Sequence, residues 1–220
     1  MRQYSVDETF FESIDSEAKA YWLGFIAADG CVQKHLISLE LSMVDEAHLL
    51  RFRDAIRSTH PIYRRPDRAM CAVAFSNKRM RLSLMALGIV PRKTYSLAFP
   101  GYLRADLTRH YMRGYFDGDG TAPGYFGVVG RLEFIAAYQD VLVRECGVSR
   151  NVMTIASRYA RIHYGGRLQI RRIFGFLYDG ATVFLERKHD SLRRILDRKM
   201  QRHRTVWRKP KPEHQAALLI

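Results

Sequence analysis

Residues 110–122 read "HYMRGYFDGDGTA" and end an apolar, aromatic run with two carboxylates, Asp117 and Asp119, set among glycines. Residues 20–32 read "AYWLGFIAADGCV" and repeat this pattern: an apolar run, a glycine four residues before a small residue, and a terminal Asp-Gly. The two Asp-Gly ends, at Asp29 and Asp119, lie 90 residues apart in a chain of 220. The motif therefore occurs once in each half, and an explanation has to cover both copies.

The composition describes a globular and strongly basic protein. Hydrophobic residues make up 47% and aromatic residues 12% of the chain, which allows a sizeable core and excludes a disordered chain. No apolar stretch approaches the roughly 20 residues of a membrane span, and the acidic first residues lack the apolar core of a signal peptide. The net charge of +14 indicates a polyanionic partner, nucleic acid before a membrane surface.

The cysteines indicate the compartment. Three of them, odd in number and widely spaced, form neither a disulfide framework nor a zinc-binding pattern. This usage is typical of a reducing environment. We therefore expect a cytoplasmic or nucleoid-associated protein, or one of an organelle matrix if the gene is organelle-encoded.

The periodicity of apolar residues repeats in the two halves as well. Strand-like alternation at residues 37–41 is followed by a helical pattern, and residues 70–94 again predict a strand and then a helix. Residues 125–147 and 160–188 repeat that order. Each half thus reads helix, strands, helix, strands, helix, as expected for an internal duplication.

The duplication also gives the domain organisation. The segments 70–94 and 160–188 both end in a basic Arg-Lys pair, at residues 92–93 and 187–188. Pro100 and Gly101 interrupt the pattern between the halves. We therefore expect two repeats and a basic C-terminal tail that is either disordered or wraps the partner, over residues 1–100, 101–202 and 203–220.

The motif helices carry small residues four positions apart, at Gly24 and Ala28 and at Gly114 and Gly118. A helical stripe without side chains lets two backbones approach closely, and such packing would bring Asp29 and Asp119 together. We expect N-terminal caps at Asp15 and Asp106 and left-handed C-terminal caps at Gly30 and Gly120.

Two carboxylates at the ends of packed helices are unfavourable by themselves, because each meets the negative end of a helix dipole and the two repel. Bound Mg²⁺ would remove both objections, since it prefers carboxylate, carbonyl and water oxygens. Two metal-bound carboxylates beside a polyanion indicate metal-assisted phosphodiester hydrolysis. A single motif would be an ordinary helix ending in Asp-Gly, and residues 117–128 lack the sixth-position Gly and twelfth-position Glu of a calcium loop.

The sequences "WLGFIAADG" (22–30) and "MRGYFDGDG" (112–120) resemble the two nine-residue signatures of the LAGLIDADG homing endonucleases in their monomeric, two-motif form. The similarity spans about residues 16–200 and includes "GIVPRKT" (88–94) and "LYDGATVFLERK" (177–188). It implies an α+β fold, a pseudo-twofold tandem αββαββα repeat with two antiparallel DNA-binding sheets around a central pair of packed motif helices. It also implies a monomer without an obligate protein partner.

The resemblance implies an activity and a metal site. Members bind a long, asymmetric double-stranded DNA target in intron homing and cut both strands with divalent metal, leaving short 3′ overhangs. The catalytic, metal-binding acids would be Asp29 and Asp119, completed by the carbonyls of Ala28 and Gly118. Two or more Mg²⁺ ions are implied, with Mn²⁺ substituting and Ca²⁺ supporting binding without cleavage.

Other positions follow from the same comparison. Motif position six, usually Asp, is Ala27 in the first copy and Asp117 in the second, and it is not a metal ligand in the family. The family's basic pocket residue aligns best with Lys78 in the first half and Arg167 in the second. A Gln that family pockets often add after the second strand aligns with Met43, so that role is unfilled.

Strand alternation predicts which side chains face DNA. With Ile37, Leu39 and Leu41 turned to the helices, the opposite face carries Ser38, Glu40 and Ser42, and Glu40 could accept from cytosine N4. The basic segment 63–68 offers phosphate contacts through Arg64, Arg65 and Arg68. The corresponding part of the second half holds Arg158, Arg161 and His163.

Three functions of different classes fit the sequence. The first is a site-specific DNA endonuclease, and the second is a catalytically silent DNA- or RNA-binding relative, such as an intron maturase or a transcription regulator. The third is an unrelated basic structural protein, which the repeat disfavours. Retention of both Asp29 and Asp119 favours the endonuclease, because binding alone has no need of two destabilising carboxylates.

Overall fold

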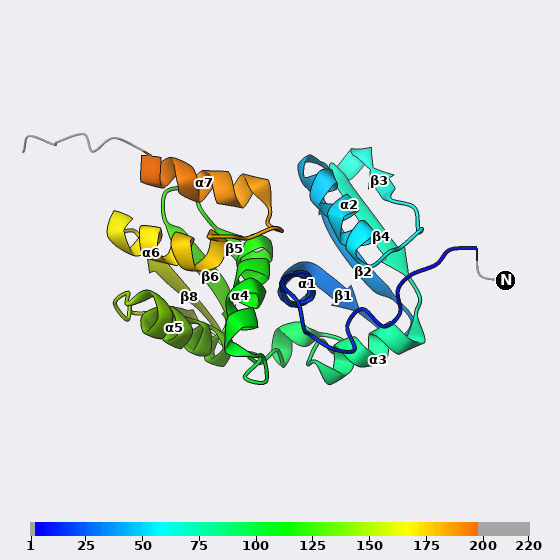
Figure 1. The fold of residues 1–220 in the computed structure, drawn as a ribbon, viewed down its shortest axis with the longest axis horizontal. Coiled ribbons are helices and arrows are strands. Elements are labelled where there is room, and N and C mark those ends of the chain that lie inside the picture. The colour runs from blue at the N-terminus through cyan, green and yellow to red at the C-terminus, as the bar shows by residue number, and fades with distance from the viewer. Residues whose placement is uncertain (1–2, 198–220) are drawn as a thin grey trace, which may run out of the picture.

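The chain folds as two successive units of the same kind, each led by one motif helix (Figure 1). The computed structural model describes residues 3–197, so the predicted tail at 203–220 lies outside the described residues. The first unit consists of α1 (Glu17–Asp29), β1 (Gly30–Val32), β2 (Ile37–Ser42), η1 (Met43–Asp45), α2 (Glu46–Ala55), β3 (Tyr63–Arg65), η2 (Pro66–Arg68), β4 (Met70–Phe75), α3 (Lys78–Ala86) and η3 (Lys93–Tyr95). The second consists of α4 (Ala105–Asp119), β5 (Gly120–Thr121), β6 (Phe126–Arg131), α5 (Leu132–Cys146), β7 (Thr154–Ala156), β8 (Tyr159–Tyr164), α6 (Arg167–Tyr178) and α7 (Glu186–Asp197).

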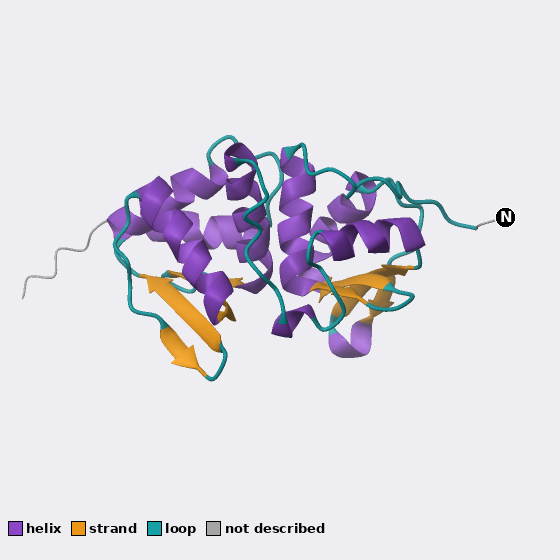
Figure 2. Cartoon of the chain, turned by 90° about the horizontal axis from the view of Figure 1, so that it is seen from below, coloured by secondary structure: helices purple, strands orange, loops and turns teal. Residues whose placement is uncertain are grey.

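The two sheets have the same topology. The strand orders are β1-β2-β4-β3 and β5-β6-β8-β7, with antiparallel pairing throughout. Figure 2 shows both sheets on one side of the molecule, with the helices covering their other faces. The predicted α+β class and the tandem repeat are confirmed.

Alternation along β2 follows the pattern that the sequence predicted. Ile37, Leu39 and Leu41 are buried against the helices, whereas Glu40 is exposed on the opposite face. Phe10, Phe11, Trp22 and Tyr178 are buried in the core, as their apolar character predicts. Among residues 3–197, no helix is long and apolar enough to cross a membrane.

The motif helices α1 and α4 lie side by side between the two units (Figure 1). A Cβ atom built on Gly24 would lie 2.0 Å from the carbonyl oxygen of Tyr111, and one on Gly114 would lie 2.0 Å from that of Tyr21. Each glycine therefore contacts the backbone of the other helix directly. The predicted close approach along the small-residue stripe is confirmed.

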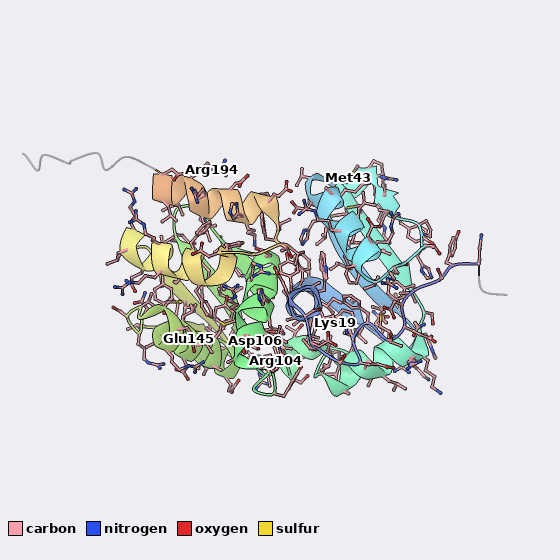
Figure 3. The ribbon with its side chains drawn as sticks, viewed as in Figure 1. Lys19, Met43, Arg104, Asp106, Glu145 and Arg194 are labelled. Atoms are coloured by element: carbon pink, nitrogen blue, oxygen red, sulfur yellow. The ribbon has the colours of Figure 1, made fainter. Side chains whose placement is uncertain are left out.

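The helix starts differ from the prediction, by one residue at α1 and by two residues at α4. Ser16 caps α1 by accepting from the backbone N–H of Lys19, and Asp15 pairs with the Lys19 side chain just outside the helix. Arg104 precedes α4, and Asp106 lies in the first helical turn, where its carboxylate accepts from Arg104 (Figure 3). Asp106 therefore meets the positive end of the dipole without capping the helix.

The glycines after the motif acids are not left-handed. Gly30 has φ −69° and Gly120 has φ −80°, both with extended ψ, so the predicted left-handed caps are wrong. The lack of room for a side chain explains the two glycines instead. A Cβ on Gly30 would lie 2.5 Å from the Ile26 side chain, and one on Gly120 would lie 2.3 Å from the Phe116 ring.

Candidate active site

The C-terminal ends of α1 and α4 bring the two motif acids together. A Cβ on Gly118 would lie 2.4 Å from the Cβ of Ala28 and 3.2 Å from Oδ2 of Asp29, so the residues before each acid are in contact across the helices. This geometry follows from the small-residue stripe, because both helices end at the same level. The acids therefore share one site.

The site disfavours two free carboxylates. Asp29 is an exposed residue, yet desolvation by the surrounding protein and the nearby Asp119 carboxylate raise its pKa to about 6. Desolvation also raises the pKa of Asp119, against the lowering effect of the nearby ammonium groups. A bound cation would offset both effects.

Two lysines complete the site, one from each half. Lys93 Nζ donates to the carbonyl oxygen of Ala28 at 2.8 Å, and Lys188 Nζ donates to that of Gly118 at 3.2 Å. Burial lowers the pKa of both lysines, and the charges of Asp29 and Asp119 oppose that shift. Each ammonium group thus holds the carbonyl that immediately precedes the motif acid of its own half.

The structure places Lys78 and Arg167, the basic residues aligned to this site by sequence, elsewhere. Lys78 is the first residue of α3 and lines a surface hollow with Lys34, His35 and Arg81. Arg167 is the first residue of α6, and its guanidinium donates to the carbonyl oxygen of Leu196.

One sequence signal does identify the two lysines. An Arg-Lys pair occurs late in each half, and Lys93 and Lys188 are the second members of these pairs. The pairs occupy equivalent places in the duplication, as the acids do. A search for basic residues repeated at matching positions would have selected them over Lys78 and Arg167.

The donor set fits Mg²⁺. The site offers the carboxylates of Asp29 and Asp119 and the carbonyls of Ala28 and Gly118, all oxygen ligands. Across residues 3–197, no group of three or more His, Cys, Asp and Glu side chains could hold a metal by itself. An ion here would depend on backbone carbonyls and water, which suits Mg²⁺ and not Zn²⁺.

Asp117, at motif position six, is engaged in the interior. Its carboxylate accepts from Tyr21 Oη at 2.8 Å, from Tyr178 Oη at 2.7 Å and from the backbone N–H of Leu185 at 2.7 Å. Desolvation raises the pKa of this fully buried carboxyl, and the three donors act against that shift. Asp117 therefore ties α1, α6 and the segment before α7 to the second motif helix.

The first sheet divides its basic residues between its two faces. Arg65 Nη1 lies 3.2 Å from Oε2 of Glu40, on the face that the helices leave open. Arg64 pairs instead with Glu46 of α2, on the helix-covered face. Arg64 is thus not on the predicted DNA face, while Arg68 is exposed in the adjacent turn, 3.8 Å from Asp67.

The second sheet presents its predicted residues on β8 and at the start of that strand. Arg161 is exposed, opposite Val129 in the register, and His163 packs edge-on against Tyr125 with ring centroids 4.9 Å apart. Arg158 lies in the turn before β8, with its guanidinium 5.0 Å from the Tyr95 ring centroid. Arg161 and His163 follow the alternation that leaves Ala160 and Ile162 buried.

Comparison with solved structures supports the same architecture. The LAGLIDADG meganuclease I-CpaMI bound to uncleaved DNA matches with a TM-score of 0.58 at 12% identity, over 84% of this chain and 92% of that one. Full-length DUF199/WhiA from Thermatoga maritima matches with a TM-score of 0.54 at 15% identity, over 86% of this chain and 65% of that one.

A third structure includes a metal. A variant of I-DmoI with its target DNA nicked in one strand, in the presence of Mn, matches with a TM-score of 0.52 at 12% identity, over 80% of this chain and 99% of that one. No protein-family model matches the sequence, and no curated protein does. This chain therefore has the two-motif fold of the LAGLIDADG homing endonucleases.

Proposed function

We propose that this protein is a metal-dependent, site-specific DNA endonuclease of the homing type, which makes a double-strand break with short 3′ overhangs in a long, asymmetric target. The observation that carries the proposal is the meeting of Asp29 and Asp119 at the ends of α1 and α4. A binding protein has no need of two carboxylates that raise each other's free energy.

The chemistry follows from the placement of the four polar side chains. When bound to these oxygens, Mg²⁺ supplies Lewis-acid charge at the scissile phosphate and activates water for attack. Lys93 and Lys188 add positive charge among the same atoms, where phosphate oxygens would arrive. Because each half contributes one acid and one lysine, the centre can serve both DNA strands.

Binding is assigned to the open faces of the two sheets, which lie on one side of the molecule (Figure 2). Exposed basic residues on or beside these faces, Arg65, Arg68, Arg158 and Arg161, would contact phosphates or base edges. We expect on the order of 6–10 neutralised phosphates, so that DNA affinity falls roughly 10³-fold or more between about 50 and 200 mM salt. A titration giving a nearly flat plot of log K against log salt would show that the positive charge serves another purpose.

The pair of Arg65 and Glu40 predicts base readout at one position. Glu40 holds the Arg65 guanidinium on the open face, and an Arg fork matches O6 and N7 of guanine while a carboxylate can accept from cytosine N4. We expect Arg65→Ala and Glu40→Gln each to relax the preference at the same G·C pair, at a cost of about 1–3 kcal/mol for Arg65→Ala.

The chain offers a matched control for this prediction. Arg64→Ala removes the neighbouring arginine, which pairs with Glu46 on the helix-covered face, and should leave base preference unchanged. The measurement is selection of bound duplexes from a randomised library, followed by sequencing. An unchanged consensus for Arg65→Ala, or a uniform loss at all positions, would refute base readout by this pair.

The proposed function is tested in two steps. A randomised duplex library is first selected for binding in Ca²⁺, which gives the target, and a plasmid carrying that target is then incubated with the protein in Mg²⁺. Conversion of supercoiled plasmid to the linear form is the expected result. A target that is bound tightly and never cut would refute the endonuclease.

That negative outcome defines the second candidate function, binding without cleavage. The match to DUF199/WhiA favours this candidate, because that protein shares the architecture over most of this chain and its structure is not named as that of an endonuclease. The two candidates differ in what they require of Asp29 and Asp119. Only the endonuclease loses its function when one of these carboxylates is removed.

A further inference from the structure

The ammonium groups of Lys93 and Lys188 contact the carbonyl oxygens that a metal ion would use in this site. We propose that these two lysines are counter-ions of the DNA-free site and that they make metal binding depend on bound DNA. The inference rests on the proposed nuclease function and concerns the order in which metal and DNA bind.

The two ammonium groups lie against the carbonyl oxygens that precede the motif acids. Lys93 Nζ lies 2.8 Å from the Ala28 carbonyl, and Lys188 Nζ lies 3.2 Å from the Gly118 carbonyl. Within the described residues, neither Asp29 nor Asp119 forms an ion pair of 4.0 Å or less. Lys93 and Lys188 therefore contact the carbonyl ligands and form no ion pair with the carboxylates, of which Asp119 also accepts a hydrogen bond from Tyr115.

The net charge of the site would change when metal binds. Two carboxylates and two ammonium groups neutralise one another in the DNA-free protein. Two divalent cations would then add four positive charges beside two lysines, in a partly desolvated site where like charges repel strongly. Phosphate groups of bound DNA supply the missing negative charge, and they also offer the displaced lysines new partners.

Metal and DNA affect each other's binding reciprocally. If DNA raises metal affinity, metal raises DNA affinity by the same factor. The lysines provide this coupling, because their positive charges repel the metal ions and attract the DNA phosphates. Removing one ammonium group should therefore increase metal affinity in the absence of DNA and reduce the additional gain that DNA provides.

The two lysines are not equally suited to the test. Lys188 is only 7% exposed and donates to three carbonyls, those of Phe116, Gly118 and Gly120, so it also caps the end of α4. Lys93 is half-buried and donates to one carbonyl. Removal of Lys188 would take a donor from three carbonyls at the end of α4, so Lys93 is the residue to change.

The experiment measures Mn²⁺ binding by the full chain without DNA and with the selected duplex, using electron paramagnetic resonance of free Mn²⁺. We expect Lys93→Met to bind Mn²⁺ at least about fivefold more tightly than wild type without DNA, and to gain less from the duplex. Lys93→Arg retains the charge and should bind as weakly as wild type. Lys34→Met loses the same charge on the exposed turn between β1 and β2 and should also behave as wild type.

The outcomes separate this inference from the proposed function. Unchanged or weaker Mn²⁺ binding by DNA-free Lys93→Met, with tight binding by wild type on the duplex, overturns the inference alone. If wild type binds no Mn²⁺ even on the duplex, the metal-dependent function fails and the inference with it. Melting temperatures in EDTA show that each variant is folded, so a weak signal is not attributed to unfolding.

Discussion

Asp29→Asn and Asp119→Asn should each abolish double-strand cleavage while leaving the fold and DNA binding intact. Asn keeps the shape of the side chain but removes the charge that would hold a metal ion at the end of α1 or α4. A metal ion supplies several kcal/mol of charge stabilisation in the transition state, so we expect a loss on the order of 10³-fold or more in rate. Plasmid cleavage in Mg²⁺ measures it.

Binding gives the control for this prediction. Burial, together with the neighbouring acid, raises the pKa of Asp29 to about 6, so neutralising either acid removes a repulsion within the protein and toward phosphate. Gel shifts in Ca²⁺ should therefore show affinity equal to or better than wild type. Full cleavage by either variant would show that the two acids do not form the metal site.

Gly24→Val and Gly114→Val should each destabilise the protein by at least about 4 kcal/mol, in the range that single substitutions seldom reach. The new Cβ would lie 2.0 Å from a backbone carbonyl of the facing helix, and no rotamer change relieves a clash with backbone. The helices would have to separate, which would also move Asp29 and Asp119 apart.

Thermal unfolding measures this effect. For a chain of this size, about 4 kcal/mol corresponds to a lowering of Tm by roughly 8–16 °C. Gly124→Ala is the matched control, because a Cβ there meets no atom within 4 Å and should change Tm little. A Gly24→Val protein that melts within a few degrees of wild type would show that the helices are not held in backbone contact.

The architecture could be predicted because its signals are local and duplicated. The glycines at 24 and 114 fix the helix packing by themselves, since the lack of a side chain is visible in sequence. The alternation of Ile37, Leu39 and Leu41 sets the faces of β2 in the same direct way. These signals depend on spacing within one element.

The basic residues of the site could not be assigned in this way, because long-range folding places them. Lys93 begins the short η3 and Lys188 lies in the first turn of α7, 64 and 69 residues after the acids of their own halves. No periodicity links such positions to a helix end. Only the repetition of the Arg-Lys pair connects the two lysines, and a repeat in sequence does not say how far they lie from the acids.

Strand register limited one further prediction and long-range packing another. Adjacent residues of a strand face opposite sides, so Arg64 and Arg65 were equivalent in sequence but pair with Glu46 and Glu40 on different faces of the sheet. Asp117 meets donors from three separate segments, and its anchoring role emerges only when these are packed together.

A strand-resolved cleavage assay on the selected duplex tests the central claim most directly, that Asp29, Asp119 and their lysines form one nuclease centre serving both strands. Wild-type protein is incubated in Mg²⁺ and in EDTA with duplex labelled on each strand in turn, and the cut positions are mapped. Cuts in both strands, offset by a few nucleotides to leave 3′ overhangs and present only in Mg²⁺, are the expected result. A duplex that is bound at the same concentrations but stays intact in both strands would contradict it.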